Sequence, residues 1–292
     1  MTLSVTSPYV EEDLPWVRGN LHAHTTMSDG ERLPQELVDQ YAVRGYGFLM
    51  ISDHDRITDT SRLHAYGMTL IAGNEVTAMG PHTLHVAART VVRPDSNRQR
   101  VIDAIVSDGG FAIMAHPNWE KHFEHCPQSV LERLEGYAGI EIFNGVVRGH
   151  EGSPVATDRW DRLLGMGRRV WGFANDDAHF VGDEGAAWNV VQAESVDADT
   201  IVSALRNGRF YASTGVKIER IRVAGRTIHI GTRNAQRIVV IGDYAQRLAA
   251  ADGPTITYTV PTDRPLKYVR FECYGFGDEM AWTQPFFIEA EN

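Results

Sequence analysis

Short apolar runs alternate with longer amphipathic stretches over roughly the first 210 residues of the chain. The amphipathic stretches have apolar residues at helical spacing and predict helices over residues 34–44, 97–107, 130–134, 157–166 and 198–206. The apolar runs have the length and flanking glycines of buried strands, at residues 16–17, 48–51, 70–72, 84–87, 111–115, 140–143 and 170–173. Strands that alternate with helices indicate an α/β fold with a mostly parallel sheet, either open or closed into a barrel.

The pattern changes after Gly215, where apolar and polar residues begin to alternate with a period of two. This period is typical of half-buried antiparallel strands, and turn signals such as Asp252-Gly253-Pro254 separate them. The strands are predicted at residues 218–223, 227–230, 237–241, 255–260 and 268–274. We therefore expect an α/β domain over residues 1–212 and a small antiparallel β domain over residues 213–292, in which Trp282 and Phe286 are core residues.

Composition argues against several classes of protein. No apolar stretch approaches the roughly 20 residues of a membrane span, and the first residues lack the pattern of a signal peptide. Cys126 and Cys273 are the only cysteines, so a disulfide framework is not expected and the predicted location is cytoplasmic. The net charge of −10 makes nucleic acid an unlikely partner. The 12 histidines are left to explain.

Most of the chemistry-bearing residues lie at or near the ends of the predicted strands. His22 and His24 are two residues apart, so on a strand they project from the same face. In a parallel β/α barrel the C-terminal ends of all strands open on one face. Further histidines and acids lie in or after later strands: His54, Glu75, His85, His116, Asp177 and His179. Together they would form a cluster that is costly to desolvate and that divalent metal ions would stabilise.

Six motifs in this order resemble those of the PHP (polymerase and histidinol phosphatase) superfamily: His22-x-His24, Ser28-Asp29-Gly30, Ser52-Asp53-His54, Glu75, Ala115-His116-Pro117 and Asp177-x-His179. The resemblance implies a distorted (βα)7 barrel with two or three divalent ions. It implies the metal ligands His22, His24, Asp29, His54, Glu75, His85, His116, Asp177 and His179, with Glu75 bridging and with Glu75, Asp177 and His179 in catalytic roles.

Two of these assignments have alternatives, and two further histidines stay outside the set. Asp29 stands where some relatives have His, and it is alternatively a cap for the helix that follows. His82 lies close to His85 and competes with it. His122 and His125 either rim the pocket or belong to an exposed loop. Residues 207–215 and 281–285 are similar to the carbaryl-hydrolase-like branch of the superfamily, which informs architecture more than substrate.

The implied ligands are imidazoles and carboxylates, which suit Zn, Mn or Fe. Three carboxylates supply less charge than two or three divalent ions, so the site would be positive and would favour an anionic substrate. The reaction expected is metal-assisted hydrolysis by a metal-bridging hydroxide. The substrate predicted is a small phosphorylated molecule, with Arg148 and Lys121 as phosphate-binding candidates.

Two other functions fit the same sequence. The metal site would equally serve a carboxylic or carbamate ester hydrolase, which should have an apolar mouth rather than an Arg or Lys near the metals. A noncatalytic metal-binding regulatory module is the alternative of another class, and its site should be closed to water. The small β domain is expected to shape the site or to form a homo-oligomer contact.

Overall fold

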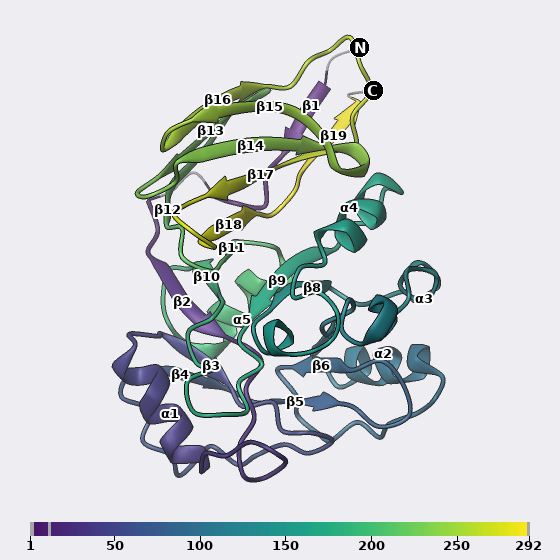
Figure 1. Ribbon diagram of the computed structural model, residues 1–292, viewed down its shortest axis with the longest axis vertical. Helices are drawn as coiled ribbons and strands as arrows, with labels where there is room; N and C mark the ends of the chain where they lie inside the picture. The colour runs from purple at the N-terminus through teal and green to yellow at the C-terminus, as the bar shows by residue number, and fades with distance from the viewer. Residues whose placement is uncertain (1–2, 11–12, 291–292) are drawn as a thin grey trace.

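The computed structural model describes residues 3–10 and 13–290, and these form an α/β part and an antiparallel β sandwich stacked along the long axis (Figure 1). The α/β prediction for the chain is confirmed. Both described chain ends lie in the sandwich, so the chain enters the α/β part from the sandwich and returns to it.

The strands of the α/β part include each of the seven predicted and three more. Parallel pairing joins β2, β3 and β4, and also β7, β8 and β9. β6 runs antiparallel to β5 and β7, and β10 runs antiparallel to β2 and β11, so the prediction of a mostly parallel sheet is wrong at these strands. The strands are β2 (Trp16–Asn20), β3 (Phe48–Met50), β4 (Thr69–Ile71), β5 (Gly73–Val76), β6 (Thr83–Val86), β7 (Phe111–Met114), β8 (Gly139–Asn144), β9 (Trp171–Asn175), β10 (Trp188–Gln192) and β11 (Phe210–Ser213).

Backbone pairing divides these strands between two sheets, so the described residues do not close into a continuous barrel. Local links join the sheets. Single bridges connect His54 with Glu75 and Ala23 with Ala178, and the Asn189 side chain spans β9 and β10. Its amide accepts from Ala174 N at 3.1 Å and donates to Ala174 O at 2.9 Å, as a neighbouring backbone would. The seven-fold (βα)7 barrel stays a prediction.

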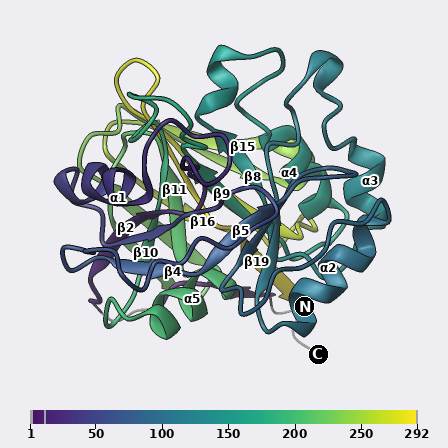
Figure 2. The same ribbon diagram turned by 90° about the horizontal axis from the view of Figure 1, so that it is seen from below.

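Five α-helices cover the strands, each where the sequence predicts one. They are α1 (Pro34–Val43), α2 (Arg98–Ser107), α3 (Gln128–Arg133), α4 (Thr157–Gly165) and α5 (Ala198–Arg206). Figure 2 shows α1 on one side of the strands and α2 and α3 on the opposite side. Side-chain caps start two helices, because Asn97 accepts from Gln99 N and Asp197 accepts from Thr200 N. Among the described residues, no helix combines the length and apolarity needed to cross a bilayer.

The sandwich consists of a three-stranded sheet facing strands of the larger sheet, and their apolar faces share one core. The smaller sheet contains β12 (Ile218–Ala224), β13 (Thr227–Thr232) and β16 (Thr255–Thr259). Facing it are β14 (Arg237–Gly242), β15 (Gln246–Asp252), β17 (Tyr268–Tyr274), β18 (Met280–Thr283), β19 (Phe286–Ala290) and the N-terminal β1 (Leu3–Thr6). All five strands predicted after Gly215 are present, and each pairs antiparallel with its neighbours, as expected.

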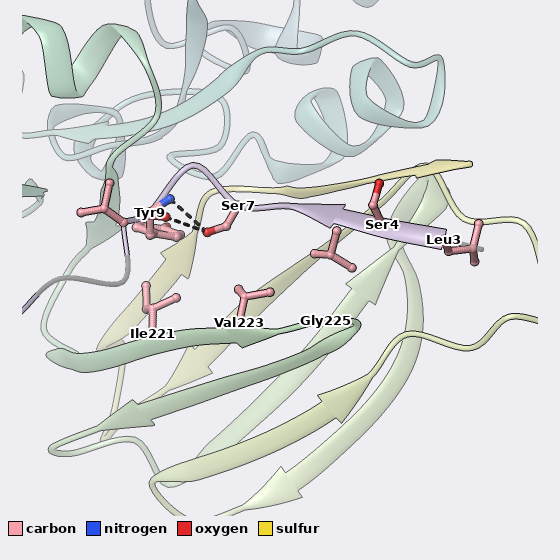
Figure 3. Close-up of a pocket in the computed structure, with 9 residues that line it drawn as sticks. Leu3, Ser4, Ser7, Tyr9, Ile221, Val223 and Gly225 are labelled. Atoms are coloured by element: carbon pink, nitrogen blue, oxygen red, sulfur yellow. Dashed lines mark hydrogen bonds between the residues drawn. The ribbon is translucent and has the colours of Figure 1, made fainter. Parts of the chain in front are cut away.

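The larger sheet runs without a break from the α/β part into the sandwich. β11 pairs with β10 on one side and with β18 on the other, so the predicted boundary at residues 212 and 213 falls inside a strand. At the other end of the chain, β1 pairs with β19 and places the N-terminal segment in the sandwich. A cavity of about 370 Å³ separates β1 from β12, lined by residues that include Tyr9, Ile221 and Val223 (Figure 3).

A buried ion pair fastens the sandwich to α4. The Arg270 guanidinium of β17 donates to both carboxylate oxygens of Asp161, at 2.7 and 2.6 Å, and also to Glu272 at 2.9 Å. Trp282 is 1% exposed and packs among core residues of the α/β part, with its ring centroid 6.0 Å from that of Phe143. The predicted core residue Trp282 therefore belongs to the junction of the two parts rather than to the sandwich alone.

Candidate metal centre

His22 and His24 follow β2 and point at the same place. Both are at most 1% exposed, and their ring centroids lie 5.2 Å apart. Ala23, between them, is held in extended backbone by a bridge to Ala178 and by donation from its N–H to Ser52 Oγ at 2.9 Å. Since alternate residues of an extended chain project from one face, the two imidazoles converge as predicted.

Asp177 and His179 reach the same place from the end of β9. Asp177 Oδ1 lies 3.0 Å from His22 Nε2 and 3.1 Å from His24 Nε2. The His179 ring stacks on that of His24, with centroids 4.2 Å apart. The backbone at Asp177 has φ of 56°, a left-handed conformation that is uncommon outside glycine and that turns the chain sharply after the strand.

Glu75 is fully buried at the centre of the cluster. Its Oε1 lies 3.2 Å from His116 Nε2 and 3.4 Å from His22 Nε2, while its Oε2 lies 2.9 Å from His54 Nδ1. One carboxylate therefore faces histidines on both sides. This position is compatible with the bridging role that the resemblance implies.

A second, more open group lies beside this buried centre. His24, Asp29, His54 and His179 each offer one ligand atom within 4.8 Å of the others. The Asp29 side chain is 53% exposed, and its oxygens lie 3.2 Å from His54 Nε2 and 3.5 Å from His179 Nε2. Asp29 does not cap α1, because that helix begins after Leu33. Of the two readings of Asp29, the structure supports the one that places it in the cluster.

Several ligand-type atoms in the cluster are buried and have no hydrogen-bond partner among the described residues. They are His22 Nε2, both ring nitrogens of His24, His82 Nδ1, His116 Nδ1 and Asp177 Oδ1. A buried polar atom without a partner costs about 1–3 kcal/mol. Coordination of a divalent cation would remove this cost, and a donor set of imidazole and carboxylate suits Zn, Mn or Fe. The residues present therefore fit the metal ions that the sequence predicts.

Electrostatics in the cluster favour ionised carboxylates. Burial is the largest influence on the pKa of Asp177 and of Glu75 and raises both, yet the neighbouring His22 imidazole holds each pKa well below its usual range. Burial lowers the pKa of His54, but hydrogen bonds to Asp29 and Glu75 raise it to about 10. Protons on these imidazoles occupy the positions that a cation would take, so cation binding would release them.

His85 does not reach the cluster, and this predicted ligand is wrong. Because β6 is antiparallel to its neighbours, its beginning rather than its end lies at the cluster. His82, just before the strand, places Nδ1 3.1 Å from Glu75 Oε1. His85 lies on the other face of β6, where its Nε2 is 3.4 Å from Asp108 Oδ2 and burial lowers its pKa. His82 takes the position that the sequence analysis assigned to His85.

Glu141 is a buried residue of the cluster that the sequence analysis missed. It lies on β8, is 1% exposed and accepts four hydrogen bonds of 2.8 Å. The donors are His22 Nδ1, the backbone N–H of His116, Asn144 Nδ2 and Asn175 Nδ2. With Nδ1 donating to Glu141, the neutral His22 ring keeps the lone pair of Nε2 free for a cation. An acid inside an apolar run is the signal that could have identified it.

Asp53 supports the loop that carries Asp29. Its carboxylate accepts from the Thr25 N–H at 2.8 Å, from Thr25 Oγ1 at 2.8 Å and from Ser28 Oγ at 2.7 Å. The Thr58 hydroxyl also donates to it. Asp53 thus orients its neighbours rather than facing the cluster itself.

A cavity of about 240 Å³ opens directly onto the cluster. Its lining combines residues of the cluster with the apolar side chains of Trp119, Val146, Val147 and Phe180. None of the described residues that line it is Lys or Arg. The lining residues are Asp29, His54, Glu75, His82, His116, Trp119, Val146, Val147, His150, Asp177, His179 and Phe180.

The two predicted phosphate-binding residues lie outside this cavity. Arg148 belongs to the 3-10 turn η2 (Val146–Gly149), is exposed, and places its guanidinium 4.9 Å from the centroid of the Phe143 ring. Val146 and Val147 of the same turn face the cavity instead. Lys121, in the 3-10 turn η1 (Lys121–Phe123), is exposed and lines a neighbouring shallow hollow.

His125 supports the cluster indirectly, through a hydrogen bond with the backbone of His82. Its Nε2 accepts from the His82 backbone N–H at 3.0 Å, and its Nδ1 lies 3.0 Å from Glu120 Oε1. Both ring nitrogens are therefore engaged, and burial followed by the nearby His116 and His82 lowers its pKa to about 2. His122 is exposed on η1.

Comparison with solved structures supports the predicted resemblance at the level of the fold. No family model and no curated protein sequence matches the chain. A two-domain protein containing a predicted PHP-like metal-dependent phosphoesterase, from Bacteroides vulgatus, superposes over 98% of this chain and 99% of its own, with a TM-score of 0.56 and 17% identity. The chain thus has the two-domain architecture of a protein with a PHP-like domain.

Two further structures overlap mainly with part of the chain. An amidohydrolase from Chromobacterium violaceum matches 57% of this chain and 89% of its own, with a TM-score of 0.43 and 15% identity. A lesion-specific endonuclease from Pyrococcus furiosus matches 66% of this chain and 56% of its own, with a TM-score of 0.48 and 14% identity.

Proposed function

We propose that this chain is a metal-dependent hydrolase that cleaves an ester bond of a small molecule. The observation that carries the proposal is the convergence of eight of the nine predicted ligands, together with His82, around buried nitrogen and oxygen atoms that lack partners. These side chains come from segments separated by more than 150 residues. The nearest neighbours of these atoms are other ligand-type atoms of the cluster, such as Asp177 Oδ1 at 3.0 Å from His22 Nε2, and a shared cation would satisfy them together.

Two or three divalent ions held here would supply a hydroxide nucleophile at neutral pH and would stabilise charge on the attacked group. The residues that would hold the ions are His22, Glu75, His82, His116 and Asp177 in the buried part of the cluster and Asp29, His54 and His179 in the open part, with His24 within reach of both parts. Glu75 would keep the bridging role that the resemblance implies. Asp177, ionised at the cavity wall, is placed to accept and hold a proton released during the reaction, and His179 would orient Asp177 from the same turn.

A phosphoester is the first substrate class, because the cluster would carry net positive charge once three divalent ions are bound. The four carboxylates of the cluster, those of Asp29, Glu75, Glu141 and Asp177, balance the four charges of two divalent ions and are exceeded by the six charges of three. Such a field favours a substrate with an anionic reacting group, although the protein as a whole has a net charge of −10.

A carboxylic or carbamate ester is the second candidate, and one observation favours it. The described lining of the cavity holds no Lys or Arg, and four of its side chains are apolar. The noncatalytic alternative receives less support. Catalytic metal sites keep a position open to water, and here the 240 Å³ cavity and the half-exposed Asp29 leave the cluster open.

The test is a panel of phosphomonoesters, phosphodiesters, carboxyl esters and carbamates with protein loaded with Zn, Mn or Fe. We expect metal-dependent turnover of at least one class and its loss in the variants His22→Ala, Glu75→Ala and Asp177→Ala. The exposed Glu124→Gln variant serves as the control and should keep full activity. Turnover that survives in all three cluster variants would refute the proposed mechanism.

A further inference from the structure

We propose that the cavity selects esters whose non-reacting group is small, uncharged and apolar, of about the size of an aryl ring. The inference rests on the proposed function and deepens it, since it names the substrate class of the same site. It derives from the apolar part of the cavity lining, here called the wall, which is formed by Trp119, Val146, Val147 and Phe180. None of these residues carries a predicted catalytic role.

Ring contacts and backbone hydrogen bonds hold Trp119 in place at the end of the wall next to His116. The Trp119 ring centroid lies 5.1 Å from that of His116 and 4.9 Å from that of His125. Its backbone N–H donates to His116 O at 3.0 Å, and its carbonyl accepts from the His125 N–H at 3.1 Å. Val147 is 2% exposed. A preformed apolar surface of this kind binds an apolar group without a large ordering cost.

Phe180 forms the outer end of the wall, and its side chain is 52% exposed. It follows His179 directly, and the backbone N–H groups of both residues donate to Asp183 Oδ2, at 3.0 and 2.8 Å. The turn is therefore held while the ring stays open to solvent. Covering this ring with a substrate group would remove apolar surface from water, which is favourable.

Charge limits what the non-reacting group can be. Arg148 packs on Phe143, and Lys121 lines an adjoining hollow that shares Trp119 and His150 with the cavity, so no Lys or Arg of the described residues lines the wall itself. His150 is the one lining residue of the described chain that is neither apolar nor part of the cluster. Burying an unpaired charge against apolar side chains is costly. The wall therefore disfavours sugar bisphosphates and nucleic acid.

The volume of the cavity also limits the size of the non-reacting group. Ligand pockets commonly span about 300–1,000 Å³, and an apolar cavity of about 150 Å³ is enough to hold benzene. The 240 Å³ cavity therefore accommodates a reacting group on the cluster and one ring or branched alkyl group on the wall. Larger groups would extend past Phe180 into solvent.

Binding of unreactive phosphonates to the metal-loaded protein tests the inference separately from turnover. Calorimetry compares phenylphosphonate with methylphosphonate, which lacks the ring, and with 4-carboxyphenylphosphonate, which adds a charge to it. We expect phenylphosphonate to bind roughly tenfold or more tightly than either of the others, the range typical of apolar-pocket discrimination. Equal affinities, tighter binding of the carboxylate-bearing compound, or no binding of any of the three would overturn the inference.

Variants of two neighbouring residues test whether Phe180 causes the preference for a phenyl group. Phe180→Ala should remove most of the preference for phenyl over methyl, whereas Val181→Ala should keep it, because Val181 is exposed next to Phe180 but does not line the cavity. An unchanged preference in Phe180→Ala would also overturn the assignment. If the phosphonates discriminate as expected but no metal-loaded protein cleaves the matching phenyl esters, the proposed function fails while the binding preference stands.

Discussion

At the residue scale, the site combines side chains that sequence can identify with backbone conformations that it cannot. His22, His24, His54 and Asp177 were predictable because a polar residue at the end of an apolar strand has few structural reasons to be there. The backbone at Asp177 and at His116 has positive φ, of 56° and 24°. Such conformations cost free energy and cluster at functional sites, but no residue type here signals them in advance.

The pair His82 and His85 gives a matched test of the ligand set. His82→Ala should lower the number of divalent ions bound per folded chain, because its Nδ1 faces Glu75 in the cluster. His85→Ala should leave that number unchanged, although the cavity left by a fully buried side chain should lower thermal stability. Elemental analysis of both variants decides between them. Metal loss in His85→Ala with full retention in His82→Ala would reverse the assignment.

Glu141 should control metal affinity without binding metal itself. In Glu141→Gln an amide donor replaces one acceptor oxygen and must face a group that already donates, such as the His116 N–H. Partners of this kind typically change metal affinity by about 10–100-fold when mutated. Competition with a chromogenic chelator measures the affinity, and the exposed Glu124→Gln is the control. An affinity equal to that of the unmodified chain would show that the carboxylate is dispensable.

At the scale of elements, helices were easier to predict than strand direction. All five helices lie where apolar spacing and capping residues predict them, since both signals are local. In the α/β part β5, β10 and β11 were missed, and β6 was taken as parallel, because pairing partners and direction depend on contacts distant in sequence. Because β6 runs antiparallel to its neighbours, His82 at its beginning reaches the cluster and His85 does not. Strand order therefore limits site prediction more than residue chemistry does.

The buried ion pair between α4 and β17 should contribute strongly to stability. Arg270→Ala leaves the Asp161 carboxylate buried without its bidentate partner, a change that typically costs about 3–5 kcal/mol of unfolding free energy. Arg237→Ala is the matched control, because its pair with Asp252 is exposed and should contribute no more than about 1 kcal/mol. Urea unfolding measures both. Equal losses in the two variants would mean that the buried pair does not hold α4 to the sheet.

At the scale of the whole molecule, the sequence predicted two units but not how they join. The change of period near Gly215 marks the sandwich, and its strands were recognisable from alternation. The continuity of the sheet through β11 and β18 was not, because a strand shared by two units carries no distinct pattern. The same holds for β1, which pairs with β19 from the opposite end of the chain.

A chain shortened to residues 1–212 should therefore not fold on its own. Truncation removes β18 from the edge of β11 and removes Trp282, Tyr268 and Phe287 from the core that they share with the α/β part. We expect such a chain to be aggregated or to lack a cooperative thermal transition, as measured by circular dichroism. A shortened chain that unfolds cooperatively and binds divalent ions would show that the α/β part is an independent domain.

The most direct test of the central claim is the metal content of the full-length chain. Elemental analysis should follow purification without chelators, incubation with Zn, Mn or Fe, and removal of free ions. We predict two or three divalent ions per chain, and clear loss of them in Glu75→Ala, whose carboxylate contacts histidines on both sides of the cluster. A full-length chain that retains no metal after this treatment would contradict the account.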